Sequence, residues 1–470
     1  MTATFPQFRQ QARIAIEDIR LQGALDTATG NLLGARIQAL AELPDSEKLR
    51  DHLKSIRSST LANLVRYLEI FERNAVAAGV HIHWASTGGD ARKIVIDIAE
   101  QHGVTLATKS KSMTTEEIHL NDALAAVGAE AVETDLGEWI IQLAQEPPFH
   151  IIGPAIHKTR EQVAELISEA SGRSLAPDDI AMLTAEARRV LREKFLAAGM
   201  GISGGNIAVA ETGSVVLVTN EGNGRLVTSA PPVHVAVIGI EKVVPTWDDA
   251  AAWLALLARS ATGQPLSVYT SIISGPARNE DPDGPREVHV VFLDNGRSRQ
   301  IGGEYEEVLQ CIRCGACLNV CPVYREAGGH AYGSPYNGPI GSVITPLYSG
   351  LRKYEALPHA CSLCQACKDI CPVRIDLPRM LLALRETEVR EGVIPWPERK
   401  VEEAAAVVLA HERLLRFVTW IFRRLQGVFL RDGRLQLPLW LDPTLGRRMP
   451  GLAQRSFRTM WQAGELESKE

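Results

Sequence analysis

All eight cysteines of the 470-residue chain lie in two copies of one short pattern. The copies read Cys311-x2-Cys314-x2-Cys317-x3-Cys321-Pro322 and Cys361-x2-Cys364-x2-Cys367-x3-Cys371-Pro372. Thiolates ligate iron–sulfur clusters, and a four-cysteine run of this spacing, closed by proline, binds 4Fe–4S clusters in bacterial ferredoxins. The pattern therefore predicts two such clusters and a chain that moves electrons.

The fourth cysteine of each run is expected to serve the other run's cluster, as it does in ferredoxins with two clusters. One cluster would then be held by Cys311, Cys314, Cys317 and Cys371. The second would be held by Cys361, Cys364, Cys367 and Cys321. Zinc is a weaker alternative, because zinc sites favour paired Cys-x2-Cys units with four ligands to one metal. Disulfides need an oxidising compartment, and nothing in the sequence points to one.

The stretch between the two runs is too long for a small βαβ ferredoxin, because 39 residues separate Cys321 from Cys361. Helices are expected to fill it, as in α-helical ferredoxin domains, although residues 328–339 read as turns.

Positive charge beside a cluster favours its more negative reduced form and raises its potential. Four basic residues lie close to the cysteines in the sequence: Arg313, Arg325, Lys368 and Arg374.

The elements that must carry these loops follow from the spacing of apolar residues. Residues 1–75 are expected to be helical, because leucine, isoleucine and phenylalanine recur there at helical spacing. Apolar runs predict strands at residues 80–84, 104–107, 151–153, 208–210, 215–218, 233–238 and 288–292. Strands that alternate with helical stretches indicate an α/β fold with a largely parallel sheet and helices on its faces.

Four parts are predicted along the chain. They are a helical N-terminal segment (1–75), an α/β domain (76–300), a two-cluster α-helical ferredoxin domain (303–385) and a basic helical C-terminal extension (398–470). The net charge is −6, yet residues 413–458 hold ten arginines and two aspartates and so carry +8, which leaves −14 for the rest.

The sequence favours a cytoplasmic protein. Residues 1–9 lack the layout of a signal peptide, and no apolar run approaches the ~20 residues that a membrane span needs. An apolar stripe flanked by arginines covers residues 413–431, which suggests a helix that lies on the inner membrane face, binds an acidic partner or packs on its own domain. No motif indicates binding to nucleic acid.

Several short segments carry a family resemblance: Lys109–Met113, Glu133–Glu138, Pro154–Lys158, Gly204–Asn206, Ala210–Ser214 and Glu287–Arg297. They resemble the lactate utilisation domain, and with both cysteine runs and the basic extension the whole chain resembles the lactate utilisation protein B family. The resemblance implies an α/β domain similar to the sugar-isomerase and CoA-transferase superfamily. It also implies an iron–sulfur electron-transfer subunit that works with two partner proteins to oxidise L-lactate to pyruvate.

Candidate catalytic and binding residues in the α/β domain remain open. Lys109, Ser110 and Lys111 would suit a small 2-hydroxy acid, but the same residues would also suit a solvated loop. His157 beside Lys158 is a candidate base for the hydroxyl proton. Glu211 lies in a Glu-Thr-Gly turn like that of a CoA-transferase nucleophile, although such a turn also forms without catalysis.

Hydride loss from lactate needs a two-electron acceptor, whereas iron–sulfur clusters take single electrons. A flavin or another two-electron centre is therefore expected, in this chain or in a partner. Two rival hypotheses are an acyl- or CoA-transferase with redox-sensing clusters, and a non-catalytic scaffold of an iron–sulfur complex.

The twelve histidines predict no metal site, because no carboxylate–histidine set accompanies His81 and His83.

Overall fold

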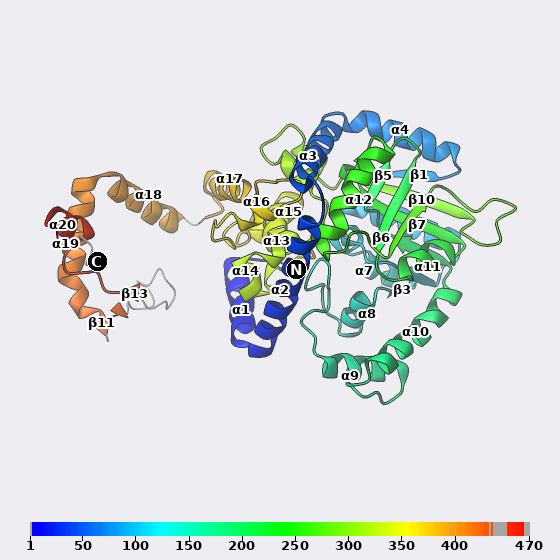
Figure 1. Cartoon of the computed structure of the whole chain (residues 1–470), viewed down its shortest axis with the longest axis horizontal. Coiled ribbons are helices and arrows are strands. Elements are labelled where there is room, and N and C mark those ends of the chain that lie inside the picture. The colour runs from blue at the N-terminus through cyan, green and yellow to red at the C-terminus, as the bar shows by residue number, and fades with distance from the viewer. Residues whose placement is uncertain (1, 395, 432–433, 436–448, 465–470) are drawn as a thin grey trace. The chain divides into compact units, whose positions relative to one another are not determined.

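The computed structural model describes residues 2–394, 396–431, 434–435 and 449–464 (Figure 1). The chain forms two compact units, Met1–Glu388 and Val389–Glu470. The first unit contains every cysteine, so the architecture of that unit positions the site.

A six-stranded sheet forms the centre of the first unit, with the strand order β1-β10-β7-β4-β2-β3. Every neighbouring pair is parallel, which confirms the predicted parallel sheet. The strands span β1 (His81–Ala85), β2 (Leu106–Lys109), β3 (Glu130–Glu133), β4 (Met200–Ser203), β7 (Val233–Gly239) and β10 (Glu287–Leu293).

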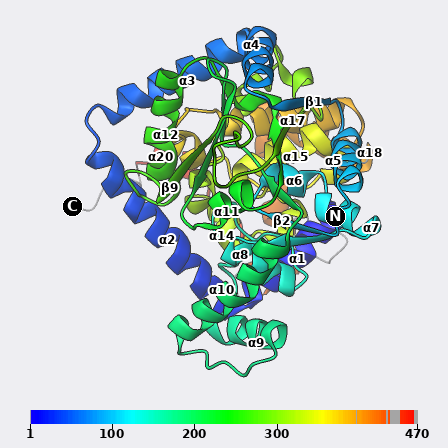
Figure 2. The same cartoon turned by 90° about the vertical axis from the view of Figure 1, so that its right-hand side faces the viewer.

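Both faces of this sheet are covered, so its central strands are apolar throughout. In β7, Val235 and Val237 face α5 (Gly88–Gln101), whereas Ala236 and Ile238 face α4 (Leu64–Ala77) and a second sheet. α9 (Arg160–Ser171) and α10 (Ile180–Ala197) pack beyond β2 and β3, at the end of the unit opposite α4 (Figures 1 and 2). The remaining helices of this domain are α6 (Met113–Glu117), α7 (Leu120–Ala126), α8 (Leu136–Leu143), α11 (Asn223–Ser229) and α12 (Trp247–Ala261).

The second sheet has the order β8-β5-β6-β9, in which β5 (Ile207–Val209) and β6 (Ser214–Thr219) form an antiparallel pair. Gly213 closes their turn with φ at 67°, and a Cβ there would lie 2.2 Å from the Ala75 nitrogen, so only glycine fits. The outer strands are β8 (Val243–Val244) and β9 (Tyr269–Ile273).

The predicted strand at residues 151–153 is wrong, because this segment is a loop. Ile151 is buried, but the polar groups nearby are satisfied by side chains rather than by a neighbouring strand. The imidazole Nδ1 of His150 accepts from the Ile152 amide at 3.1 Å, and Lys111 donates to the Ile152 carbonyl at 2.8 Å. The segment resembles a strand in the sequence only because two isoleucines stand side by side there.

Four N-terminal helices connect the two halves of the first unit: α1 (Phe5–Glu17), α2 (Ile19–Ala41), α3 (Ser46–Ala62) and α4. α1 and α2 pack on helices of the cysteine-bearing region, whereas α4 packs on β1 and β8. In Figure 1 the blue α1 and α2 lie beside α13 and α14.

The cysteine-bearing region, residues 303–385, is built from short helices and contains no strand. The stretch between the two runs holds α14 (Pro322–Ala327), a 3-10 turn at His330–Tyr332 and α15 (Gly338–Ser349), so the expected helices are confirmed. The other helices are α13 (Ala316–Asn319), α16 (Ala366–Ile370) and α17 (Leu377–Arg390).

The second unit contains α18 (Trp396–Ala410), α19 (Glu412–Leu425), α20 (Phe457–Gln462) and three two-residue strands, Leu430–Arg431, Arg434–Leu435 and Met449–Pro450. Within the described parts of the chain, no helix is both long and apolar enough to cross a membrane.

Candidate iron–sulfur centre and adjoining cavity

The two cysteine runs share one backbone conformation. Arg313 and Gly315 of the first run have φ of 60° and 75°, and Leu363 and Gln365 at the equivalent positions of the second have 57° and 65°. This left-handed conformation turns the amide of the third residue back to the first cysteine. Arg313 donates to Cys311 Sγ at 3.4 Å, and Leu363 donates to Cys361 Sγ at 3.3 Å. Each loop thus folds around a point at which its thiols could ligate a cluster.

The thiols of the two runs interact across the runs. The pKa of Cys314 is raised to about 12, chiefly by burial and also by the neighbouring thiols of Cys311 and Cys371. Burial also raises the pKa of Cys321 to about 11, with a further contribution from Cys361 and Cys364.

The remaining thiols extend the same two groups. Cys367 interacts with Cys321, Cys361 and Cys364, while Cys317 interacts with Cys311, Cys314 and Cys371 and also with Cys367 of the other group. A bound metal stabilises thiolates whose pKa burial has raised, and the two groups of four suit iron–sulfur cubes.

Three buried arginines from the N-terminal helices surround the Cys311 group, and sequence reasoning missed them. Arg36 of α2 donates to the Ile370 carbonyl at 2.5 Å. Arg50 of α3 donates to the carbonyls of Asp369 at 2.5 Å and Cys371 at 2.8 Å. Arg57 of α3 donates to the Leu309 carbonyl at 2.9 Å. They sit some 250 to 330 positions before their partners, so no local signal reveals them.

The basic residues predicted beside the clusters differ in their surroundings. Arg313 is 10% exposed, and its charge interacts with the Cys311 thiol. Arg325 is paired with Asp26 at 2.7 Å, and Lys368 is paired with Asp376 at 2.5 Å. Arg374 is paired with Asp51 and with Glu47. Arg313 lies 3.6 Å from Glu241, so each of the four charges has a carboxylate nearby, and Arg313 is the one whose charge interacts with a cluster thiol.

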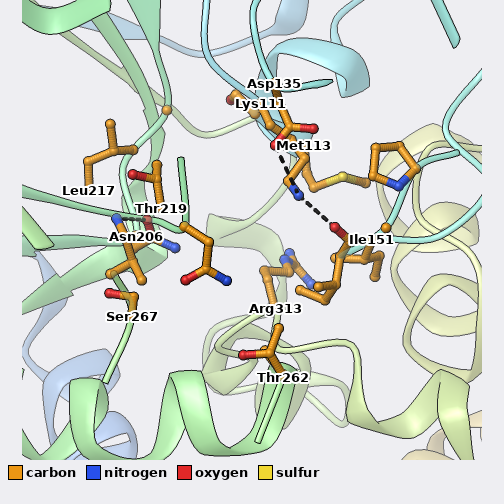
Figure 3. Close-up of a pocket in the computed structure, with 18 of the residues that line it drawn as sticks. Lys111, Met113, Asp135, Ile151, Asn206, Leu217, Thr219, Thr262, Ser267 and Arg313 are labelled. Atoms are coloured by element: carbon orange, nitrogen blue, oxygen red, sulfur yellow. Dashed lines mark hydrogen bonds and ion pairs between the residues drawn. The ribbon is translucent and has the colours of Figure 1, made fainter. Parts of the chain in front are cut away.

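A cavity of about 580 Å³ lies between the α/β domain and the first cysteine loop (Figure 3). Its volume is in the range of sites for cofactor-sized ligands. The apolar part of the wall comes from Met113, Ile151, Ile152, Ile156, Leu217 and Leu257. Its polar groups include Lys111, Asp135, Asn206, Thr219, Lys242 and Arg313.

Two basic residues, Lys242 and Arg313, line this cavity and also contact Cys311. Lys242 Nζ lies 3.5 Å from the Cys311 carbonyl, and burial together with Arg313 lowers the pKa of its ammonium to about 7. Arg313 packs over the Tyr336 ring at 4.8 Å and lies 3.6 Å from Glu241. Arg313 Nη1 is buried and has no hydrogen-bond partner among the described residues.

A buried ion-pair network fastens the α/β domain to the cysteine-bearing region. Arg297 pairs with Glu117 at 2.7 Å and with Glu241 at 2.8 Å, and Tyr336 donates to Glu117 at 2.7 Å. Although burial opposes its charge, Arg297 lowers the pKa of Glu241 to about 2. The network holds the cavity wall against the first cysteine loop.

The three predicted substrate-binding residues have separate roles. Lys109 is buried, and its ammonium binds Glu116 at 2.5 Å and Glu133 at 2.6 Å, so both carboxylates raise its pKa against the effect of burial. Ser110 is buried, and its amide donates to the Ile202 carbonyl at 2.9 Å. Lys111 alone of the three lines the cavity, where its ammonium lies 3.9 Å from Asp135.

The weak catalytic candidates lie outside the described lining of the cavity. Glu146 binds both His157, at 2.7 Å, and Lys158, at 2.5 Å. Burial lowers the pKa of His157 to about 4, so it is neutral at pH 7. Glu211 accepts from the Trp247 amide at 3.1 Å and so caps the start of α12.

Comparisons with known proteins agree with this arrangement. A family described as "LUD domain" matches residues 68–293, and one described as "4Fe-4S dicluster domain" matches residues 307–375. A solved structure of a duf162 family protein from Deinococcus radiodurans covers 49% of this chain and 98% of its own. Its 15% identity and TM-score of 0.27 are too low to support an argument about the fold.

Curated relatives align over nearly the whole chain. "Lactate utilization protein B" of Macrococcus caseolyticus (strain JCSC5402) is 42% identical, over 98% of this chain and 97% of its own. The protein of that name from Bacillus pumilus (strain SAFR-032) is 41% identical, over 98% of each chain. "Uncharacterized electron transport protein YkgF" of Escherichia coli (strain K12) is 39% identical, also over 98% of each. The chain therefore belongs to the lactate utilization protein B family.

Proposed function

We propose that this chain is the iron–sulfur electron-transfer subunit of a cytoplasmic complex that oxidises L-lactate to pyruvate. Two matching cysteine loops, whose thiols lie close enough to interact within and between the runs, carry the proposal. The substrate follows from the names of the relatives, which tie the family to lactate utilisation. The oxidation releases two electrons and two protons, and the two clusters can each take one electron.

The proposed clusters have crossed ligands. Cys311, Cys314, Cys317 and Cys371 hold cluster 1, and Cys361, Cys364, Cys367 and Cys321 hold cluster 2. The electrostatic interactions of Cys371 with Cys311, and of Cys321 with Cys361, support this pairing. The buried arginines at cluster 1 favour its reduced form, so we expect cluster 1 to have the higher reduction potential.

The cavity beside Arg313 is the proposed place where a reduced two-electron centre meets cluster 1. A flavin bound in the cavity or presented by a partner subunit would supply hydride chemistry there. Arg313, Lys242 and Lys111 give the cavity wall positive charge suited to a phosphate or carboxylate. Arg313 also donates its amide to Cys311 Sγ, which makes the path from cavity to cluster short.

The test is an anaerobic assembly of the chain with its two partner subunits, to which L-lactate is added before EPR spectra are recorded. Assemblies that carry Cys311→Ser or Cys361→Ser identify the signals that belong to this chain. We expect signals of reduced 4Fe–4S clusters that disappear in these variants. Signals that never arise from this chain, although the partners become reduced, would leave only a scaffold role.

An acyl-transfer activity has less support, because Glu211 is engaged at the start of α12 and does not line the described cavity. A chain deprived of its clusters and incubated with acyl-CoA separates the two functions. A transferase would form a covalent adduct on Glu211 without clusters, whereas the electron-transfer subunit would form none.

A second candidate activity belongs to α19, which we propose binds an anionic membrane surface. Phe417, Trp420, Phe422 and Leu425 are all more than half exposed, and Arg416 and Arg424 are exposed among them. Such a helix lies in the lipid interface and is attracted by acidic headgroups. Co-sedimentation with phosphatidylglycerol vesicles should fall for Phe417→Ser with Trp420→Ser, and binding that these changes do not alter would contradict the proposal.

A further inference from the structure

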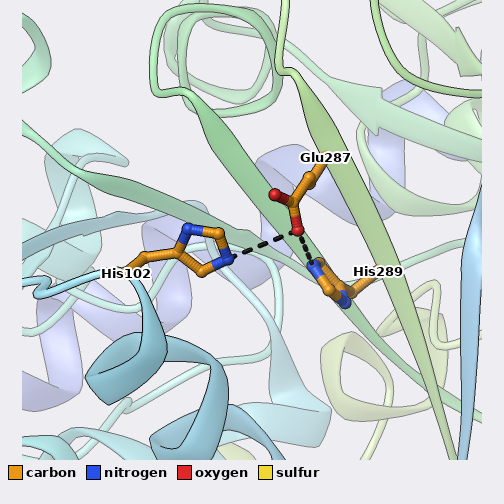
Figure 4. A group of neighbouring side chains, drawn as sticks. All are labelled: His102, Glu287 and His289. Atoms are coloured by element: carbon orange, nitrogen blue, oxygen red, sulfur yellow. Dashed lines mark ion pairs between the residues drawn. The ribbon is translucent and has the colours of Figure 1, made fainter.

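A carboxylate and two histidines converge at the start of β10, which corrects the expectation that no such set exists. Glu287 and His289 lie two positions apart on β10, and His102 lies at the end of α5 (Figure 4). No local motif reveals this group, because 185 positions separate His102 from Glu287 and only the fold brings them together.

The distances between the donor atoms differ from those of ordinary hydrogen bonds. Glu287 Oε2 lies 3.3 Å from His102 Nε2 and 3.5 Å from His289 Nε2, and the three donor atoms lie within 4.8 Å of one another. Both nitrogens are buried, and neither has a hydrogen-bond partner among the described residues. Two imidazoles therefore face a carboxylate without bonding to it.

The two distances from Glu287 to the histidine nitrogens are close to the ligand–ligand distances of a tetrahedral ion. Zinc bonds of about 2.0–2.1 Å place two tetrahedral ligands about 3.3–3.4 Å apart. Cis ligands of an octahedral ion with bonds of about 2.0–2.1 Å are separated by only about 2.8–3.0 Å. Two histidines and one glutamate also form a ligand set that zinc uses when its fourth position is open.

The neighbouring side chains hold His289 as a metal ligand is usually held. His83 Nε2 lies 3.1 Å from His289 Nδ1, so the other ring nitrogen is engaged and Nε2 faces Glu287. His81 stacks on the same ring with centroids 4.8 Å apart. His289 is only 6% exposed, so these neighbours fix the orientation of its ring.

We propose that His102, Glu287 and His289 bind one divalent transition-metal ion, with zinc as the probe, and leave its fourth position to water. Glu287 is 39% exposed and His102 is 23% exposed, so the ion and its water have access to solvent. The ion would tie the end of α5 to β10. This site is separate from the cysteine loops and does not depend on the proposed function.

A second histidine–carboxylate group provides a contrast. Glu146, His157 and His330 also lie close together, but Lys158 already binds Glu146 at 2.5 Å. His157 Nε2 contacts Glu146 at 2.7 Å, and His330 Nε2 contacts the Pro147 carbonyl at 3.0 Å. A cation there would have to displace an ammonium, so this group serves as the control.

The test uses the full chain, purified anaerobically with its iron–sulfur content intact, freed of any affinity tag and dialysed against EDTA. Zinc is titrated against a fluorescent chelator, and zinc per chain is measured by mass spectrometry. We expect one tightly bound zinc. His102→Gln and Glu287→Gln should each weaken binding by ~10-fold or more. Glu146→Gln, in the second histidine–carboxylate group, should leave zinc binding unchanged.

Unchanged iron, labile sulfide and circular dichroism show that each variant is folded. Because both informative changes are at partly exposed residues, folding should survive them. If either variant does unfold, anomalous diffraction at the zinc edge on the wild-type chain decides, and it should give a peak between the three side chains. A wild-type chain that retains no zinc, equal retention by His102→Gln and Glu287→Gln, or a peak only at cysteines would overturn the proposal.

Discussion

At the scale of single residues, the cysteines were identifiable from the sequence because cluster ligation imposes a fixed local spacing. Their charged surroundings were not. Arg36, Arg50 and Arg57 come from helices that precede the cysteine runs by some 250 positions or more, and each contacts backbone carbonyls rather than a motif. Spacing along the chain predicts the ligands, whereas folding decides which charges surround them.

Crossed ligation makes a prediction for the fourth cysteine of each run. Cys321→Ser should damage the cluster of the second run, and Cys371→Ser should damage that of the first. Reductive titration followed by EPR resolves the two clusters and shows which signal changes. If each variant loses the signal of its own run, the crossed assignment is wrong.

Arg36 makes a prediction about potential. Arg36→Gln removes a buried positive charge that interacts with Cys314 and Cys371, so the reduced form of cluster 1 loses stabilisation and its potential should fall by tens of millivolts. Arg325→Gln is the control, because Arg325 is exposed and already paired with Asp26. A redox titration followed by EPR measures both. Equal potentials in the two variants would exclude the proposed role of Arg36.

At the scale of elements, the parallel sheet was predictable because buried strands and amphipathic helices have different apolar periods. The same reasoning failed at residues 151–153, because a segment of three residues is too short for an apolar period that separates a strand from a loop. The interface network of Glu117, Glu241 and Arg297 was also invisible, because its members come from three distant segments. Their proximity follows from topology alone.

This network predicts a large loss of stability. Arg297→Gln leaves Glu117 and Glu241 buried without their cation, which should cost about 3–5 kcal/mol of unfolding free energy. The control is Arg299→Gln, two positions away, where the side chain is exposed and a change should have little effect. Thermal unfolding under anaerobic conditions compares them. Matching melting temperatures would mean that the network contributes little.

At the scale of the whole molecule, buried histidines give stability a defined pH dependence. Burial lowers the pKa of His150 and His234 to about 4, from about 6.5 in an unfolded chain. Between these values the unfolded chain binds more protons, so stability is full above pH 6.5 and is lost as the pH falls towards 4.

The loss should reach about 2 kcal/mol for each histidine between pH 6.5 and 5. Melting temperatures measured across that range, with iron content checked at each pH, should decline. His234→Gln should decline less steeply, because Gln replaces the titrating group beside Ser203. A variant that declines as steeply as wild type would contradict this account of His234.

Everything proposed for electron transfer depends on the two cysteine loops holding iron and sulfide. The most direct measurement is the iron and acid-labile sulfide content of the chain purified without oxygen. Two clusters require about eight iron atoms and eight sulfides per chain. A folded, oxygen-free preparation without stoichiometric iron and sulfide, or one whose cysteines hold zinc instead, would contradict the account.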